Sequence, residues 1–370
     1  MMQKLTCSIP SSAISYEIEI QSGLLKNPLP YLATLASRFA IIADDCIPAL
    51  YGEQLQSSLQ AAGCEVHQFT FPSGEHFKTR HTKELLENQL FEKGLGRDTC
   101  ALALGGGAVT DMAGYLAATY CRGIPLVMIP TTLLGMVDAS IGGKNGVNVP
   151  YGKNLLGCIY QPKKVFIDPV TLHSLPLKEL ANGVVEMIKH ALIADSAYFE
   201  YLEGHSGQLL ALEQTVVEKA IFESCRIKKT IVEQDERENG KRHLLNFGHT
   251  VGHALENLTH YALSHGEAVA IGLLVESHLA WQLGKLSMSS FERLHHILNK
   301  YGIPLRLPCR FSLEALLNAM RLDKKSIAGQ PRFVIIEEIG SPLCYSSSYC
   351  MHVAPLLLQR AVEWMNDSFS

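Results

Sequence analysis

The chain has 370 residues, of which 47% are hydrophobic and 18% charged, and its 36 acidic and 32 basic side chains give a net charge of −4 with neutral histidines. The apolar content excludes an intrinsically disordered chain, and the mildly acidic balance disfavours a protein that binds nucleic acid through electrostatic attraction. A chain of this length is typical of two domains that each bury a core of their own.

Compartment is indicated by three features. The first twelve residues lack the long apolar run of a signal peptide. Charge, proline or glycine interrupts the later apolar stretches, so that the run of about 20 apolar residues needed to span a membrane is missing. The ten cysteines are scattered and form no C-x-x-C pair, which is typical of small apolar side chains in a reducing compartment. We therefore expect a cytoplasmic protein that does not interact with a membrane.

The first half of the chain contains short apolar runs that end in Gly, Pro, Asp or Thr, with helical patterns between several of them, as at 108–120. The runs that indicate strands are 39–43, 66–71, 100–104, 126–129 and 165–167. Short apolar strands that alternate with helices predict a parallel sheet covered on both faces.

After Pro176 the pattern changes to long segments with helical periodicity, and a strand is expected only near 332–336. The expected helices are 177–192, 209–232, 250–258, 267–283 and 291–300. The sequence therefore predicts an α/β domain followed by a helical domain, with a boundary between residues 168 and 177.

Three polar loops follow predicted strands and indicate a nucleotide. Gly105-Gly106-Gly107 follows one strand and opens a helix, where backbone N–H groups and the helix N-terminus favour an anion such as pyrophosphate. Pro130-Thr131-Thr132 and Ser73-Gly74-Glu75 follow two further strands. Ligands of an open parallel sheet bind at the carboxyl ends of its strands, so the three loops together favour a nucleotide over three unrelated turns. The glycine triplet itself departs from the G-x-G-x-x-G pattern.

A cluster of potential metal ligands lies in the second half. His249 and His253 are four residues apart and share one face of a predicted helix. Glu186 and Lys189 are three apart on an apolar helix, and His265 precedes another. One glutamate and two histidines with an open fourth position form a known catalytic zinc site. Spacing alone does not decide which two of the three histidines are ligands, and a chain with 15 histidines also contains structural ones.

Several polar side chains lie in apolar or glycine-rich segments, as an anion site requires: Arg122, Lys144, Lys153, Asn154, Lys189, Lys228, Arg242, Lys324 and Lys325. Lys144 follows two glycines that would present it to a phosphate. Each of these residues taken alone is an ordinary surface residue, and they form a site only if they converge. The acidic segment 235–238 is expected to be an exposed turn without chemistry.

Taken together, the motifs resemble those of the 3-dehydroquinate synthase family, in that family's order and over essentially the whole chain. The matching segments are 105–107 with Asp111, 130–132, 138–144, Glu186-x-x-Lys189, Asn246-x-x-His249-x-x-x-His253 and 265–267. The resemblance implies a lyase that converts 3-deoxy-D-arabino-heptulosonate 7-phosphate into 3-dehydroquinate and phosphate, in the shikimate pathway of aromatic amino acid biosynthesis. It also implies catalytic NAD and a zinc or cobalt ion.

The same resemblance implies the architecture and the partners. It predicts an α/β N-terminal Rossmann-like domain with a mostly parallel sheet that binds NAD (1–174). An α-helical C-terminal domain that binds metal and substrate (175–370) would follow. The expected partners are a small sugar-phosphate substrate and a second copy in a homodimer, without nucleic acid or membrane.

Matched position by position, the resemblance implies that Glu186, His249 and His265 are the metal ligands and that His253 is a non-ligand histidine near the substrate. The other catalytic positions that match are Lys144, Lys189, Asp138 and Asn246. The substrate-binding positions are Arg122, Asn154, Lys228, Arg242 and Lys324, with Lys325 as an alternative to Lys324 and with Arg122 reaching the neighbouring subunit's site. The positions that match NAD contacts are Asp44, Glu75, Lys78, Gly106, Gly107, Asp111, Thr131, Thr132, Lys144, Lys153, Thr171 and Ser174. Cys46 departs from the asparagine that the family commonly has there.

Three other functions compete with this one. A glycerol-dehydrogenase-type polyol dehydrogenase would yield net NADH, and another sugar-phosphate cyclase, such as a 2-deoxy-scyllo-inosose or valiolone-type synthase, would act on a different sugar. Arg242 near Asn246, with Lys228 upstream, favours a carboxylated substrate over both. A nucleotide-binding regulatory protein with a dead site is the third, and the intact set of potential metal ligands argues against it.

Overall fold

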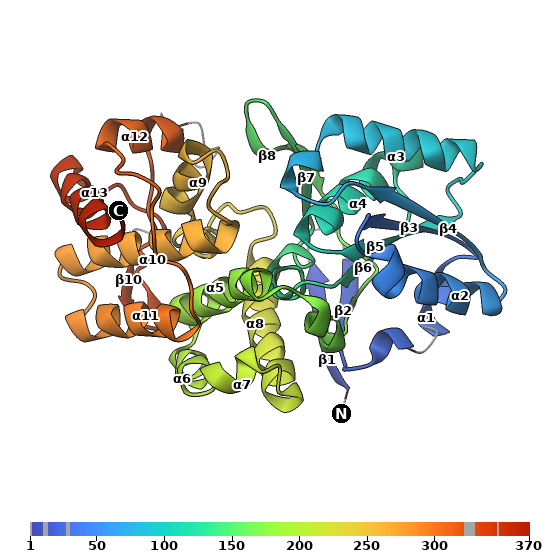
Figure 1. Cartoon of the computed structure of the whole chain (residues 1–370), viewed down its shortest axis with the longest axis horizontal. Helices are drawn as coiled ribbons and strands as arrows, with labels where there is room; N and C mark the ends of the chain where they lie inside the picture. The colour runs from blue at the N-terminus through green and yellow to red at the C-terminus, as the bar shows by residue number, and fades with distance from the viewer. Residues whose placement is uncertain (1, 10–13, 27–29, 322–329, 346–347) are drawn as a thin grey trace. The chain divides into compact units, whose positions relative to one another are not determined.

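The computed structural model describes residues 2–9, 14–26, 30–321, 330–345 and 348–370 (Figure 1). The chain forms two compact units. The first is Met1–Leu175 with Val217–Lys229, and the second is Pro176–Val216 with Thr230–Ser370. The boundary expected at residue 174 agrees with this division except for one segment, because Val217–Lys229 belongs to the first unit. Lys324 and Lys325 lie outside the described residues, so the expectation that one of them binds phosphate stays a prediction.

The first unit is built on a seven-stranded sheet with the strand order β1-β2-β9-β6-β5-β3-β4. The strands are β1 (Gln3–Ile9), β2 (Ile14–Ile20), β3 (Arg38–Asp44), β4 (Glu65–Phe71), β5 (Thr99–Gly105), β6 (Leu126–Pro130) and β9 (Lys164–Ile167). Among the strands described, β1 and β2 pair antiparallel and every other pair in this sheet is parallel. The predicted α/β class with a mostly parallel sheet is confirmed.

Helices cover both faces of this sheet, as a parallel sheet requires (Figure 1). Leu32 on α1 (Pro30–Leu35) and Leu55 on α2 (Glu53–Ala61) pack against Leu102 and Leu104 of β5. Because successive side chains of a strand point to opposite faces, Ala103 faces the other way. That face is covered by α4 (Gly107–Thr119), which packs on β5 and β6, next to α3 (Arg80–Glu92). The strand β5 is buried along its whole length, which explains its unbroken apolar sequence.

Three regions of β-structure differ from the sequence-based expectation. The loop expected around Lys144 is the start of an antiparallel hairpin of β7 (Lys144–Val149) and β8 (Gly152–Ile159). Glycines interrupt the alternation of apolar and polar residues that would have indicated these strands. They are required where the two strands approach closely, because a Cβ at Gly157 would lie 2.0 Å from the Asn145 carbonyl oxygen. The strand expected at 332–336 is displaced to β10 (Ile336–Glu338), which pairs with β11 (Ser341–Pro342). The strands β1 and β2 were not expected at all.

The second unit consists mainly of helices. They are α5 (Leu177–Ala194), α6 (Ser196–Gly204), α7 (Ser206–Leu210), α8 (Gln214–Gln234), α9 (His249–Leu258), α10 (His265–Gln282), α11 (Met288–Lys300), α12 (Leu313–Arg321) and α13 (Pro355–Phe369), where part of α8 belongs to the first unit. The single helix expected at 209–232 is two, because the chain turns at Leu212 with a φ of 55°. Across the described ranges, no helix combines the length and the apolar character needed to cross a membrane.

Helix α10 is the buried centre of this unit and packs against α5, α9, α11 and α13. Small residues let α9 and α10 approach closely. A Cβ at Gly272 would lie 1.9 Å from the carbonyl oxygen of Gly248, and one at Gly252 would lie 3.1 Å from the Cα of Val269. This close packing places the first turn of α9 beside the second turn of α10, which contains Val269 and Gly272.

Candidate active site

Three helices of the second unit bring Glu186, His249 and His265 together. Glu186 lies on α5 and is fully buried, while the two histidines are the first residues of α9 and α10. The Nε2 atoms of His249 and His265 lie 3.4 and 3.3 Å from Oε1 of Glu186. One ligand atom from each of the three residues lies within 4.8 Å of the other two. Two imidazoles and a carboxylate in this arrangement are suited to a zinc-type divalent cation.

Local structure fixes the start of α10, and with it His265. Ser264 and Glu267 form a capping box, in which Ser264 Oγ accepts from the Glu267 amide and Glu267 accepts from the Ser264 amide. Asn182 Oδ1 accepts hydrogen bonds from Ser264 Oγ at 2.9 Å and from the Gly266 amide at 3.1 Å. Asn182 lies on α5 four residues before Glu186, so it holds the start of α10 against the helix that carries the glutamate. Sequence reasoning missed this asparagine, although the spacing of four residues places it on the same helical face.

Both imidazoles are also held through their second nitrogen. His249 Nδ1 lies 3.1 Å from the Phe247 carbonyl oxygen, and His265 Nδ1 lies 3.5 Å from Oε1 of Glu256. Burial lowers the pKa of His265, but the carboxylates of Glu256 and Glu186 outweigh it and raise the pKa to about 10. The His265 imidazole is therefore a cation when only these side chains are present, and it must lose a proton to bind a metal.

The remaining histidine of the cluster, His253, lies on the same helix as His249. Its ring centroid is 5.3 Å from that of His249 and 6.2 Å from that of His265. Its ligand atom groups with those of Glu256 and His265. Lys189 is buried beside Glu186, and its ammonium contacts Oε2 of that carboxylate. Spacing did not decide which two of the three histidines are ligands. In the structure, His249 and His265 are the neighbours of Glu186.

The polar loops of the first unit lie at one edge of the sheet. The strand β4 lies on one side of β3, whereas β5 and then β6 lie on its other side. The order in which the parallel strands are added therefore reverses between β3 and β5. Such a reversal is the usual ligand site of an open parallel sheet. Asp44 ends β3, Gly105 ends β5, and Thr131 follows β6 at this edge.

The glycine triplet leaves the start of α4 open. Gly106 is the N-cap of α4 and has no side chain to cap it, so the first amides of the helix stay available to an anion. A Cβ at Gly106 would lie 3.0 Å from Cγ2 of Thr132, and one at Gly107 would lie 3.5 Å from Cβ of Ala139. A side chain at Gly106 would therefore press on the adjacent threonine loop.

A buried charge network lies next to this edge. Lys78 is 3% exposed, and its Nζ lies 2.9 Å from Oε1 of Glu75 and 2.9 Å from Oδ2 of Asp111. Asn148 also donates to Oε1 of Glu75, at 2.8 Å. Burial raises the pKa of Asp111 despite the nearby ammonium, whereas for Glu75 the effect of burial is outweighed by Lys78 and Lys153, which hold its pKa below the ordinary value. Glu75, Lys78 and Asp111, which are all predicted to bind NAD, thus also form one network of ion pairs.

Two further predicted NAD positions, Thr171 and Ser174, lie in a helical turn after β9, and Asp44 ends β3. Thr171 Oγ1 donates to the Asp168 carbonyl at 2.9 Å, and Ser174 Oγ lies 2.6 Å from the hydroxyl of Tyr51, which the sequence did not single out. Burial raises the pKa of Asp44, although the Cys46 amide donates to its carboxylate at 3.1 Å. The backbone contact of Cys46 does not depend on its side chain.

The segment 235–246 corrects one expectation. The expected turn is present at residues 235–238, but only Arg237 in it is exposed, and Asp235 accepts hydrogen bonds from the amides of Asn239, Gly240 and Arg242 at 2.8–2.9 Å. Burial acts to raise the pKa of Asp235, but these amides lower it below its ordinary value. The other acidic residue with a role is Glu238, whose Oε1 accepts from Asn246 Nδ2 at 2.6 Å. Asp235 therefore shapes the loop that carries Arg242, which is itself buried and donates to the Glu236 carbonyl.

The remaining predicted substrate positions lie in the first unit. Lys228 Nζ lies 2.6 Å from Oδ1 of Asp138, so these two are brought together. Lys144 and Asn154 are exposed on the β7–β8 hairpin, and Arg122 lies in a tight turn after α4 with a φ of 66°. The expected convergence of these residues on one substrate stays a prediction.

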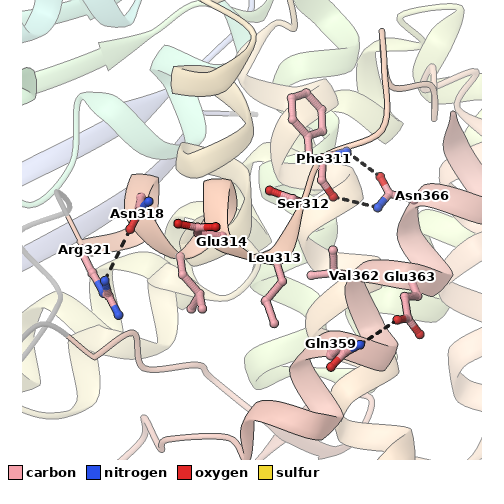
Figure 2. A pocket seen from close by; sticks show the side chains of 11 residues that line it. Phe311, Ser312, Leu313, Glu314, Asn318, Arg321, Gln359, Val362, Glu363 and Asn366 are labelled. Atoms are coloured by element: carbon pink, nitrogen blue, oxygen red, sulfur yellow. Dashed lines mark hydrogen bonds between the residues drawn. The ribbon is translucent and has the colours of Figure 1, made fainter.

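Two surface grooves of the second unit do not coincide with the metal-ligand cluster. One has a volume of about 720 Å³ and lies between α12 and α13 (Figure 2). Some of its polar side chains already have partners, because Asn366 bonds to the backbone of Phe311 and Gln359 donates to Glu363, as Figure 2 shows. The other lies between α11 and α13, around Phe291 and Trp364. We assign neither groove a role in the chemistry.

Comparison with known proteins places the chain in a family. The family models described as 3-dehydroquinate synthase N-terminal and C-terminal match residues 68–182 and 183–326. A 3-dehydroquinate synthase from Nitrosomonas europaea is 44% identical over 330 residues, covering 88% of this chain and 89% of its own. A solved 2-epi-5-epi-valiolone synthase from Streptomyces hygroscopicus with NAD⁺ and Zn²⁺ bound is 30% identical, with a TM-score of 0.87 and coverage of 96% and 98%.

The fold is also that of a 2-deoxy-scyllo-inosose synthase solved with carbaglucose-6-phosphate, NAD⁺ and Co²⁺. Its TM-score is 0.85 at 23% identity, with 98% of this chain and 99% of that one covered. The predicted two-domain architecture is therefore confirmed, and the resemblance in the motifs extends to most of the sequence. The chain belongs to the 3-dehydroquinate synthase family.

Proposed function

We propose that the chain converts 3-deoxy-D-arabino-heptulosonate 7-phosphate into 3-dehydroquinate and phosphate, as a lyase of the shikimate pathway that uses NAD and a zinc or cobalt ion. Membership of the family supports this activity over the other candidates. The observation that carries it is the buried cluster of Glu186, His249 and His265, with Lys189 against the glutamate. A regulatory protein with a dead site has no need of such a cluster.

The metal-ligand cluster fits the cation in its chemistry. Two Nε2 atoms face one carboxylate oxygen, and the second nitrogen of each ring is held by an acceptor, as ligand histidines require. Glu186, His249 and His265 would hold the ion, and a bound divalent cation polarises an oxygen of the substrate as a Lewis acid. The Lys189 side chain contacts Oε2 of Glu186, and we assign it to an anionic group of the substrate.

The sheet edge of the first unit fits NAD. The open amides of Gly106 and Gly107 suit the pyrophosphate, and Asp44 at the end of β3 suits a ribose hydroxyl. We assign the same role to the other predicted NAD positions, which include the network of Lys78. NAD⁺ held there would supply a hydride acceptor that also returns the hydride, so the reaction would have no net redox change.

Elimination of phosphate explains why a redox cofactor is needed. Phosphate leaves poorly from an unactivated carbon. Oxidation of a hydroxyl to a ketone acidifies the C–H bond on the adjacent carbon, and removal of that proton makes elimination of the phosphate possible. An imidazole ordinarily titrates near neutral pH, which suits His253 to take the proton of the hydroxyl that is oxidised. After the ketone is reduced again, ring opening and an intramolecular aldol closure give the carbocycle.

Recognition of the substrate depends on its two anionic ends. The planar guanidinium of Arg242, held in place by the loop that Asp235 shapes, suits the carboxylate. We assign Lys144, Asn154, Lys228 and Lys324 to the phosphate and the hydroxyls of the sugar, with Lys325 as the alternative to Lys324. Asp138 positions the Lys228 ammonium, and Asn246 is placed by Glu238.

The organisation of the protein follows from the same proposal. Residues 1–174 bind NAD, and residues 175–370 bind the metal and the substrate, in a cytoplasmic homodimer. Exposed Leu155 and Ile159 on β8 support an interface in the first unit. If Arg122 serves the neighbouring site, mixing inactive Arg122→Ala and His249→Ala proteins restores activity in the heterodimers. Mixtures that stay inactive after exchange of subunits would contradict that role.

One assay separates this function from its competitors. With zinc and sub-stoichiometric NAD⁺, the protein should release phosphate from the heptulosonate phosphate for many turnovers without accumulating NADH. Steady NADH production from glycerol would instead indicate a polyol dehydrogenase. Release of phosphate from glucose 6-phosphate but not from the heptulosonate phosphate would indicate a different sugar-phosphate cyclase.

A further inference from the structure

We propose that Glu256 is a positioning residue of the metal centre, which holds the Nδ1–H of His265 so that its Nε2 is directed to the cation. The inference rests on the ligand set proposed above and adds a residue that none of the sequence motifs contains. Glu256 lies on α9, seven residues after His249, and is 2% exposed.

His265 lies between two carboxylates. Its Nε2 lies 3.3 Å from Oε1 of Glu186, and its Nδ1 lies 3.5 Å from Oε1 of Glu256. A neutral imidazole carries its proton on one nitrogen, and a nitrogen that binds a metal carries none. With Nε2 on the side of Glu186 and His249, the proton belongs on Nδ1, where Glu256 accepts it. A fixed proton on Nδ1 selects the tautomer that can bind the metal.

The two ligand histidines are held in the same way but by different acceptors. His249 Nδ1 faces the neutral carbonyl oxygen of Phe247 at 3.1 Å, whereas His265 Nδ1 faces a carboxylate. A carboxylate makes the imidazole a more basic ligand than a carbonyl does, because it stabilises the positive charge that metal binding draws onto the ring. Glu256 should therefore contribute to metal affinity through charge as well as through orientation.

The burial of Glu256 supports this role. A carboxylate that is almost completely removed from water costs free energy unless positive charge lies near it. The negative charges of Glu186 and Glu256 flank the same imidazole, and together they match the charge of a divalent cation. A divalent cation would supply positive charge beside both carboxylates, in addition to the Lys189 ammonium that contacts Glu186.

A competing role for Glu256 involves His253. The two residues are three apart on α9 and so share a helical face, and the ligand atoms of His253, Glu256 and His265 lie within 4.8 Å of one another. If the carboxylate oriented His253 alone, its removal would reduce turnover and leave metal affinity unchanged. Metal affinity therefore distinguishes the two roles.

The test measures the zinc affinity of the full-length protein by competition with a chelator of known affinity, and the visible absorption of the cobalt form. Glu256→Gln keeps the size and an acceptor oxygen but removes the charge, and Glu256→Leu removes both. Loss of such a partner weakens metal binding about 10- to 100-fold, so we expect about 10-fold for Gln and a larger loss for Leu. Glu292→Gln, the same change at an exposed position of α11, should bind zinc like the wild type.

A further variant controls for folding. Glu256→Asp keeps the charge, so it should bind zinc more tightly than Glu256→Gln if its metal-free form unfolds at a similar temperature. Zinc affinity of Glu256→Gln equal to that of the wild type would overturn the inference, even if its turnover fell. The ligand set itself is tested alongside with His249→Ala, whose retention of wild-type affinity would overturn the proposed metal centre and this inference with it. Loss of zinc in His249→Ala with unchanged affinity in Glu256→Gln would overturn the inference alone.

Discussion

Replacing Lys78 with methionine removes the ammonium that Glu75 and Asp111 share, and we expect a large loss of stability in the first unit. Both contacts are 2.9 Å, and Lys78 is almost completely buried. Removing one partner of a buried charge network typically costs 3–5 kcal/mol. Because the Glu75 side chain is 35% exposed and Asp111 is 17% exposed, water screens part of the effect, and we expect about 3 kcal/mol.

Chemical denaturation of Lys78→Met and wild type near pH 8 and again near pH 5.5 measures this effect. Burial already raises the pKa of Asp111, and without the ammonium its pKa rises further. The folded variant then binds a proton that the unfolded chain does not, so its stability deficit should shrink as the pH falls. Lys78→Met with Asp111→Asn should be more stable than Lys78→Met alone. A deficit below about 1 kcal/mol, or one that grows towards low pH, would refute the reasoning.

Two further changes test other parts of the structure. Burial lowers the pKa of His278, which stacks on Trp364 at 4.5 Å, from an ordinary 6.5 to about 4. The buried imidazole is neutral in the folded protein, so its contribution to stability is present above pH 6.5 and is lost as the pH falls towards 4. The contribution of His278 should lower the unfolding free energy by about 2 kcal/mol between pH 7 and pH 5. In His278→Phe the unfolding free energy should fall less over the same range. Equal pH dependence in both proteins would contradict this. Ser264→Ala removes the cap of α10, and we expect a loss of about 1 kcal/mol and weaker zinc binding, since His265 is the next residue. Unchanged thermal unfolding and zinc affinity would show that the cap does not position the ligand.

Much of the fold could be predicted from the sequence because its elements have strong local signals. The strand β5 is an unbroken apolar run followed by glycines, and α9 carries two histidines at helical spacing. The β7–β8 hairpin could not be recognised, because its glycines are required by close backbone contact between strands and break the alternation that marks a strand. The strands β1 and β2 also gave too weak a pattern.

The candidate site was predicted less completely, for a related reason. Spacing placed His249 and His253 on one helical face but did not choose between them. That choice depends on how α5, α9 and α10 pack, which brings His249 within 3.4 Å and His265 within 3.3 Å of Glu186. Glu256 was not predicted, because a single glutamate in a helix forms no recognisable motif in the sequence. Its role depends on neighbours that lie on other helices. Resemblance to a family supplied the ligand set that the pattern left open.

The most direct test of the account is the metal content per chain, measured by elemental analysis together with phosphate release on the same samples. We expect one zinc or cobalt ion per chain in the wild type and in His253→Ala, with turnover lost in His253→Ala, and neither metal nor turnover in His249→Ala. A His249→Ala protein that retains one ion per chain, or a chelated wild type that releases phosphate at the full rate, would contradict the account.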